Sequence, residues 1–201
     1  MSKQNFLDPE KLTEWQQKIW EIATAHGWHD KPLSPEHYCG LIMTEMAEAI
    51  EADRNNNKRA NSTGFHELLL NQAESIEGLS DYWYDMWYCI YYNEYIKGSI
   101  EEEFADVVIR LLDMAQEIHG DKMKWHGYYP LGEAFNKNKS FIENAWFFIR
   151  EVLNWGTMNL SDSVSFMFAW AHHLDIDLWL HISWKMKYNQ LRPYKHGGKK
   201  Y

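Results

Sequence analysis

Cysteine, proline and long apolar runs are all scarce in this chain of 201 residues. Its two cysteines, Cys39 and Cys89, stand among apolar residues without the spacing of a metal site, so we expect reduced core thiols. The longest uncharged apolar-rich stretch, 163–174, is too short to span a bilayer. Residues 1–5 lack the basic-then-apolar pattern of a signal peptide. These absences predict a cytoplasmic protein with no membrane association.

An excess of positive charge is missing as well. Lysine and arginine number 20 against 29 aspartates and glutamates, which gives a net charge of −9. Affinity for the phosphate backbone comes mainly from lysine and arginine, so this balance argues against a general nucleic-acid binder. A small anionic substrate would need local cations or metal ions.

Large apolar and aromatic side chains are abundant. Hydrophobic residues make up 45% of the chain, which contains 11 tryptophans and 12 tyrosines. This is enough to bury one substantial core in a chain of ordinary domain size. We find no apolar and polar alternation long enough for a strand, whereas helical spacing recurs along the chain. The sequence therefore predicts a single all-α domain over 1–201.

Capping residues and periodicity set the expected helix boundaries. Ser34 and Ser99 are predicted N-caps, and Ser99 with Glu102 forms a capping-box pattern. The 65–96 segment has rings on all sides over 82–88, so it is either a buried helix or part of an aromatic pocket. The expected helices cover about 12–27, 35–53, 65–96, 99–119, 141–155 and 161–189, with loops over 54–64 and 120–140 and a break near 175–177.

Two pairs of carboxylates carry the chemistry that the sequence suggests. Glu45 falls inside the apolar arc of its helix and Glu48 lies at the edge, while Glu103 and Asp106 are three residues apart on the helix after Ser99. Acidic pairs at this spacing are also common on solvated helix faces. A carboxylate directed into a core, however, needs a cation or dense hydrogen bonding. Two antiparallel helices with such pairs would make an oxygen cage suited to Mg²⁺.

These residues belong to sequence motifs that resemble those of a known superfamily. The similar pieces are 27–32 followed by 41–54, which contains Glu45-Met46-Ala47-Glu48; 102–113, which begins Glu102-Glu103-Phe104-Ala105-Asp106; and Lys185-Met186-Lys187-Tyr188-Asn189 with Arg192-Pro193-Tyr194-Lys195-His196-Gly197-Gly198-Lys199. In this order they resemble the all-α nucleoside triphosphate pyrophosphohydrolases, the superfamily of MazG and the dimeric dUTPases, especially its small MazG-like members.

The resemblance implies an activity and a site. Family members hydrolyse a (deoxy)nucleoside triphosphate at the α–β bond to a monophosphate and pyrophosphate with Mg²⁺, for which Mn²⁺ is an alternative. The implied metal ligands are Glu45, Glu48, Glu103 and Asp106. The residues implied to lie near the phosphates are Lys31, Lys185, Asn189, Arg192, Lys195 and Lys199. We expect Glu48 or Glu51 to orient the attacking water, and Trp28 to lie near the base because it precedes the Lys31 loop. The alternative is a catalytically inactive helical module that binds nucleotides or acts as a scaffold.

The chain departs from the small family members in two ways. Residues 55–98, rich in tryptophan and tyrosine, intervene between the two acidic motifs as an insertion. Residues 118–121 are also echoed at 174–177, and the same shift places Glu103 on Asn159 and Asp106 on Asp162. We therefore expect 141–201 to be a degenerate second half-bundle with a basic tail; an unrelated helical insertion is the alternative. Because family members often build their core as a dimer, a homodimer is the expected assembly if the duplication is incomplete.

Overall fold

Helices are the only regular elements in the part of the chain that the computed structural model describes, residues 7–75, 81–126, 135–153 and 159–198. The predicted all-α class is therefore confirmed. The elements are α1 (Pro9–Ala25), α2 (Pro35–Arg54), α3 (Ser62–Ser75), α4 (Asp81–Tyr95), α5 (Ile100–His119), the 3₁₀ turn η1 (Gly120–Lys122), α6 (Phe141–Leu153), α7 (Leu160–His173), α8 (Leu178–Leu191) and α9 (Lys195–Gly198). Within the described ranges, no helix has both the length and the apolar character needed to cross a membrane.

Side-chain caps start the two helices that carry the acidic motifs. Ser34 accepts a hydrogen bond from the backbone N–H of His37, and Ser99 accepts one from that of Glu102. Both predicted N-caps are therefore confirmed. The Glu102 side chain does not complete the expected capping box on Ser99, because one of its carboxylate oxygens accepts from the N–H of Gly98 instead. The other carboxylate oxygen of Glu102 accepts from Lys185 Nζ.

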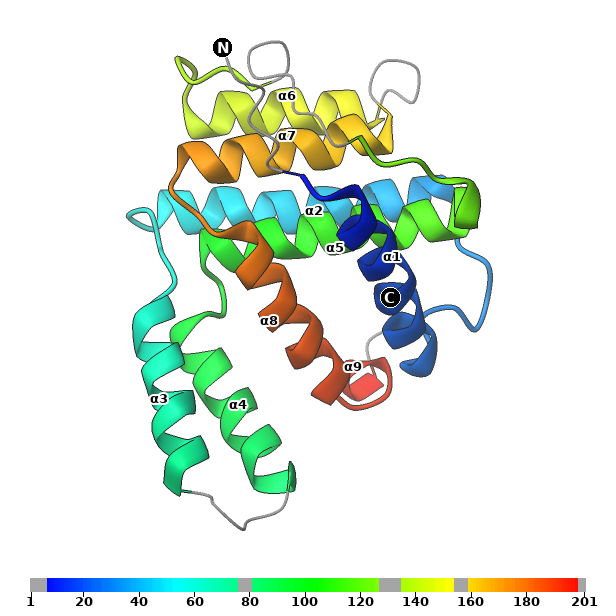
Figure 1. The fold of residues 1–201 in the computed structure, drawn as a ribbon. Helices are drawn as coiled ribbons and strands as arrows, with labels where there is room; N and C mark the ends of the chain where they lie inside the picture. Colours follow the sequence, from blue (N-terminus) through cyan, green and yellow to red (C-terminus); the bar gives the residue numbers. More distant parts are fainter. Residues whose placement is uncertain (1–6, 76–80, 127–134, 154–158, 199–201) are drawn as a thin grey trace.

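Helix α5 lies at the centre of the molecule. It contacts α1, α2, α7 and α8, and most of its side chains are buried. Figure 1 shows α2 and α5 side by side across the middle, with α6 and α7 packed on one side and α1 and α8 on the other. The hydrophobic core accordingly surrounds α5, and any polar residue on this helix must find its partners inside the protein.

The 55–98 insertion forms a hairpin of two helices, α3 and α4, rather than the one helix expected over 65–96. Tyr88 and Tyr92 are buried on the face of α4 that packs against α8, and Tyr92 stacks on Tyr188 at 4.3 Å between ring centroids. Tyr82 and Trp83 are exposed. The rings of 82–88 are thus not all buried, because α4 packs against α3 and α8 and leaves part of its surface exposed.

Helices α6 and α7 pack against each other and cover α2 and α5. Asn159 is the N-cap of α7 and accepts a hydrogen bond from the backbone N–H of Asp162 at 2.9 Å. The two residues that the repeat aligns with Glu103 and Asp106 therefore start a helix instead of forming an acidic site. That α6 and α7 descend from a duplication stays a prediction. The break expected near 175–177 is confirmed, since α7 ends at His173 and α8 begins at Leu178.

Candidate functional site

A cavity of about 390 Å³ lies between α1, α2, α5 and α8, with further walls from the loop after α1 and from the C-terminal segment. Its volume is in the range of small-molecule sites. The carboxylates that line it are Glu45, Glu48, Glu102, Glu103, Asp106 and Asp113. The cations that line it are Lys97, Arg110, Lys185 and Arg192. Acidic and basic groups from distant parts of the sequence thus share one hollow.

The two acidic motifs meet across the pair of helices α2 and α5. Glu45, Glu103 and Asp106 each offer a carboxylate oxygen, and these oxygens all lie within 4.8 Å of one another. Glu48, one turn after Glu45 on α2, lines the same cavity. The spacing of three residues places both members of each pair toward the same side of their helix. All four predicted metal residues therefore line one cavity, and three of them form the close cluster.

Two basic side chains offset part of this negative charge. Arg110 Nε lies 3.0 Å from Glu45 Oε1, and Lys185 Nζ lies 2.6 Å from Asp106 Oδ2. Lys185 is 6% exposed. Burial lowers the pKa of its ammonium, but the charges of Asp106 and Glu102 outweigh burial, so the net pKa is raised. Lys185 therefore stays charged inside the protein.

Burial raises the pKa of the Glu103 carboxyl to about 9, and the nearby charges of Asp106, Glu102 and Glu48 add to this effect. The charge of Lys185 acts to lower the pKa of the Glu103 carboxyl, but the opposing effects outweigh it. Burial also raises the pKa of Asp106 to about 7, although Lys185 opposes the shift. No ion pair to Glu103 is found among the described residues. Glu103 therefore keeps a proton at neutral pH. If all the carboxylates were ionised, the cluster would hold more negative charge than Arg110 and Lys185 neutralise, which is the environment that a bound cation would stabilise.

Beyond the acidic cluster, the cavity is more apolar. Ile19, Ile22 and Ala23 of α1 line it together with Trp28 and Met186. The C-terminal segment folds back here, because the backbone N–H of Lys195 donates to the carbonyl of His26 at 3.0 Å. The cavity therefore combines charged groups with apolar and aromatic side chains.

A glycine allows this close approach of the C-terminal segment. Gly27 has a φ of 78°, and a Cβ there would lie 2.3 Å from the ring of Tyr194. The Tyr194 hydroxyl donates to Asp30 Oδ2 at 2.6 Å, and Lys195 Nζ lies 3.2 Å from the same oxygen. The segment that begins at Gly27 and the basic tail are therefore in contact. In the sequence they are two separate motifs of the family resemblance.

The predicted substrate residues fall into two groups. Trp28, Lys185, Asn189 and Arg192 line the cavity. Asn189 Oδ1 is buried without a hydrogen-bond partner, so the cavity wall presents an acceptor for a donor on a ligand.

The other predicted substrate residues do not line the cavity. Lys31 is exposed. Lys195 lies beside the cavity and is paired with Asp30. Lys199 lies outside the described residues.

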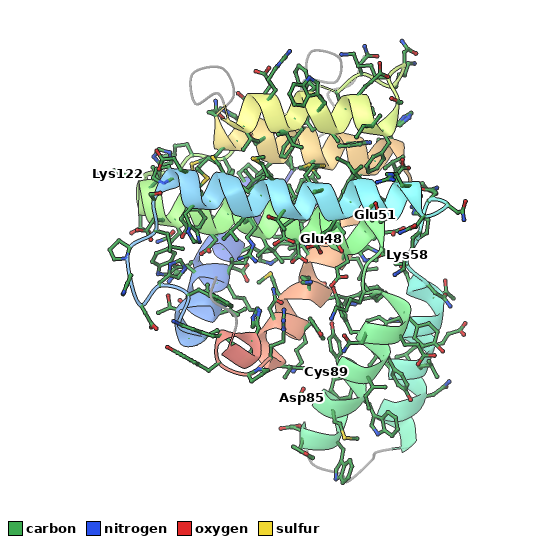
Figure 2. All side chains as sticks on the ribbon, turned by 180° about the vertical axis from the view of Figure 1, so that it is seen from behind. Glu48, Glu51, Lys58, Asp85, Cys89 and Lys122 are labelled. Atoms are coloured by element: carbon green, nitrogen blue, oxygen red, sulfur yellow. The ribbon has the colours of Figure 1, made fainter. Side chains whose placement is uncertain are left out.

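The two candidates for orienting water differ in position. Figure 2 shows both Glu48 and Glu51 near the C-terminal end of α2. Glu48 lines the cavity. Glu51 does not; it is exposed and pairs with Arg54 at 3.0 Å. The geometry therefore favours Glu48 over Glu51 for this role.

Several cavity residues were not predicted from the sequence. Glu102 had been explained as a helix cap, yet its second oxygen accepts from Lys185 Nζ at 2.5 Å. Arg110 stands four residues after Asp106 on α5, a spacing that could have identified it as a neighbour of the cluster. Tyr188, Lys97 and His196 enter the cavity through contacts between distant segments, for which the sequence carries no local signal.

Comparison with family models, with curated proteins and with solved structures finds no match to this chain. The family resemblance therefore rests on the sequence motifs alone. A function is therefore best inferred from the residues that line the cavity and from their chemistry.

Proposed function

We propose that this chain is a Mg²⁺-dependent nucleoside triphosphate pyrophosphohydrolase of the MazG-like kind, which converts a (deoxy)nucleoside triphosphate to its monophosphate and pyrophosphate. One observation carries the proposal. Oxygens of Glu45, Glu103 and Asp106 lie within 4.8 Å of one another, and the same cavity is lined by Lys185 and Arg192. A cation cage beside groups that bind phosphate is the arrangement that phosphate chemistry needs.

The donor set fits a hard divalent cation. The ligands would be the carboxylates of Glu45, Glu48, Glu103 and Asp106, and Mg²⁺ prefers oxygen donors. The raised pKa of Glu103 fits as well, because a cation would offset the burial and the repulsion that now favour the protonated form. A bound cation would supply charge neutralisation at the phosphates and activation of a water molecule.

The chain's own residues would bind and orient the substrate. Lys185 and Arg192 can donate hydrogen bonds to phosphate oxygens. Trp28 and the apolar residues of α1 would hold the base at the other end of the cavity. From Glu103 to Asp113, both of which line the cavity, α5 extends roughly 15 Å at its usual rise per residue. This length would allow the phosphates to bind near Glu103 and the base to bind near Asp113.

Glu48 is the residue best placed to act on water. In the proposed step it accepts the proton of the attacking water as that water's oxygen forms a bond to the α-phosphorus. The bond between the α-phosphorus and the bridging oxygen breaks, and pyrophosphate leaves with the electron pair. A carboxylate positioned in this way acts as a general base.

A second function is favoured by the ion pairs in the cluster. Arg110 and Lys185 already neutralise one carboxylate each, so the cavity could bind a nucleotide without turnover. Such a binding module would retain affinity for nucleotides, whereas pyrophosphate would not be released.

The test is a hydrolysis assay on the full chain. The four common ribonucleoside triphosphates, the four deoxyribonucleoside triphosphates and dUTP are each incubated with and without Mg²⁺ or Mn²⁺, and monophosphate and pyrophosphate are quantified. Glu48→Gln is the test variant. Glu51→Gln, one turn farther along α2 and outside the cavity, is the matched control.

The expected result is metal-dependent release of pyrophosphate that Glu48→Gln abolishes and Glu51→Gln preserves. Equal loss in both variants would remove Glu48 from its proposed role. Tight nucleotide binding with no product from any substrate would favour the binding module.

A further inference from the structure

Lys185 is held between two carboxylates that differ in their surroundings. Its Nζ lies 2.6 Å from Asp106 Oδ2 and 2.5 Å from Glu102 Oε1. Asp106 is part of the acidic cluster that includes Glu45 and Glu103, whereas Glu102 is not. The second oxygen of Glu102 is fixed by the N–H of Gly98. Only one of the two partners of Lys185 is therefore a candidate cation ligand.

A cation in the cluster and Lys185 would compete for Asp106. A lysine ammonium has three N–H donors, and two of them are now directed to Asp106 and Glu102. Lys185 is only 6% exposed. If it lost both carboxylates, its buried ammonium would be left unpaired, at a cost of several kcal/mol. Glu102 prevents this loss, because its other hydrogen bond keeps it in place.

The α3–α4 hairpin provides further support for Lys185. Its Nζ lies 5.9 Å from the ring centroid of Tyr92, which comes from α4, and 5.6 Å from that of Tyr188. Rings at this distance stabilise a buried ammonium. Neither ring can accept the ion-pair role of a carboxylate, so Glu102 remains the charged partner when Asp106 is occupied.

We propose that Glu102 is a positioning residue for Lys185. Glu102 keeps the ammonium beside the acidic cluster while Asp106 binds the cation, and the N–H that bonded to Asp106 becomes available to a phosphate oxygen of the substrate. This role rests on the proposed function, which provides the cation and the phosphate. It reconciles two properties of Lys185, its burial in ion pairs and its place in the wall of the cavity.

The proposal predicts opposite effects of two variants on cation affinity. In Glu102→Gln, Asp106 becomes the only charged partner of Lys185, so Lys185 competes more strongly and the affinity for Mn²⁺ falls about 10-fold. In Lys185→Met the competitor is absent, and the affinity for Mn²⁺ rises about 10-fold. Glutamine retains an oxygen for the N–H of Gly98, so the local backbone can remain unchanged.

The chain offers matched controls for both variants. Glu101→Gln changes the adjacent carboxylate, which is equally buried but pairs with Arg59 and does not line the cavity. Lys187→Met changes a lysine of the same helix whose partner is Asp85, 2.7 Å away. Figure 2 shows Asp85 on the α3–α4 hairpin, apart from Glu48. Both controls should leave Mn²⁺ affinity within about twofold of the wild type, because they lack contact with the cluster.

The experiment measures Mn²⁺ binding by calorimetry for the wild type, the four variants and the double variant Glu102→Gln/Lys185→Met. Because the double variant removes both charges of one ion pair, it keeps the test valid if Lys185→Met alone fails to fold. Without Lys185, Glu102 has no ammonium to hold. The double variant should therefore bind Mn²⁺ as tightly as Lys185→Met, or more tightly than the wild type where Lys185→Met cannot be measured.

Binding of inorganic triphosphate to the Mn²⁺-loaded protein is the second readout. It should weaken about 10-fold in both Glu102→Gln and Lys185→Met and remain unchanged in the controls. A residue that only caps α5 would lower the melting temperature without this pattern.

The outcomes separate this inference from the proposed function. If Glu102→Gln lowers Mn²⁺ affinity equally with and without Lys185, Glu102 acts through its own charge and the positioning role is overturned. A change of the same sign in both single variants also overturns it. A wild type that binds no Mn²⁺ overturns the proposed metal site, and the inference with it.

Discussion

Helices α5 and α7 are both buried, yet they contain polar groups of different kinds. Helix α7 buries Ser161, Ser163 and Ser165 among large apolar residues. The Ser165 hydroxyl donates to the carbonyl of Ser161 at 2.8 Å, and that of Ser163 donates to the carbonyl of Asn159 at 3.1 Å. These two hydroxyls are satisfied within their own segment, and the Ser161 hydroxyl accepts from the backbone N–H of His126 at 2.9 Å, so none of the three depends on a charged partner. The polar residues of α7 therefore indicate packing and no ligand.

Helix α5 buries carboxylates, which cannot be satisfied in this way. Glu101 needs Arg59, Glu102 needs Lys185, and Asp113 lies 2.9 Å from His29. Each partner comes from another part of the chain. Glu103, for which no ion pair is found among the described residues, has its pKa raised to about 9 by burial and by neighbouring carboxylates. The comparison indicates how a site is best identified. Buried ionisable side chains whose charge the protein does not neutralise are a better sign than buried polar side chains in general.

The largest effect is expected when a charge is placed on α7. Ser165→Asp would bury a carboxylate in a helix that offers no cation, which should lower the free energy of unfolding by about 3 kcal/mol or more. Ser165→Asn is the control for the added volume. Thermal unfolding with and without Mg²⁺ checks the prediction. Rescue of Ser165→Asp by Mg²⁺ would show that α7 can also form a cation site and would break the contrast with α5.

The next effect concerns catalysis. Because residues around a metal typically contribute 10–100-fold, removal of the direct ligand in Asp106→Asn should reduce hydrolysis by more than about 100-fold. Asp162→Asn, at the position that the repeat pairs with Asp106, should leave hydrolysis unchanged. Steady-state assays on the best substrate measure both. A loss of similar size in Asp162→Asn would mean that α7 contributes to the reaction.

The helices could be predicted from the sequence because their signals are local. Ser34 and Ser99 cap as expected, and the break before Leu178 is confirmed. The division of 65–96 into α3 and α4 was missed, because Leu69, Ala73, Ile76 and Leu79 continue a helical spacing of apolar residues up to Tyr82. The hairpin is instead held by packing between helices, since α4 contacts both α3 and α8.

The candidate site was predictable only in part, for the same reason. The carboxylates that meet in the cavity follow an i, i+3 pattern, so their shared side could be read from spacing. Lys185 was expected near phosphates from the family resemblance, but its ion pairs with Glu102 and Asp106 join residues far apart in sequence. Glu102 already had a local explanation as a cap, which concealed its second contact.

A smaller effect should appear in the pH dependence of stability. Because folding raises the pKa of Glu103 from 4.5 to about 9, the folded state keeps a proton that the unfolded chain has lost. The free energy of unfolding therefore falls as pH rises between these values. Asp106 shows the same effect only up to about pH 7, so Glu103 is the cluster carboxyl that continues to contribute between pH 7 and 9.

Glu103→Gln should remove this fall and be more stable than the wild type at pH 8 in EDTA by about 1 kcal/mol, or roughly 2–4 °C in Tm. Melting curves from pH 6 to 9 test this. Parallel pH profiles for the two proteins would show that the charge of Glu103 is compensated after all. Mg²⁺ should raise the Tm of the wild type more than that of the variant.

The smallest effect is expected for the hydroxyls of α7. Ser163→Ala removes a donor whose acceptor, the carbonyl of Asn159, already accepts the backbone N–H of Ser163 in the first turn of the helix. The variant should lose less than about 1 kcal/mol of stability, and hydrolysis and Mn²⁺ affinity should not change. Chemical denaturation measures the difference at constant pH. A loss several times larger would mean that this hydroxyl has a role beyond the carbonyl of Asn159, and the contrast between neutral α7 and charged α5 would weaken accordingly.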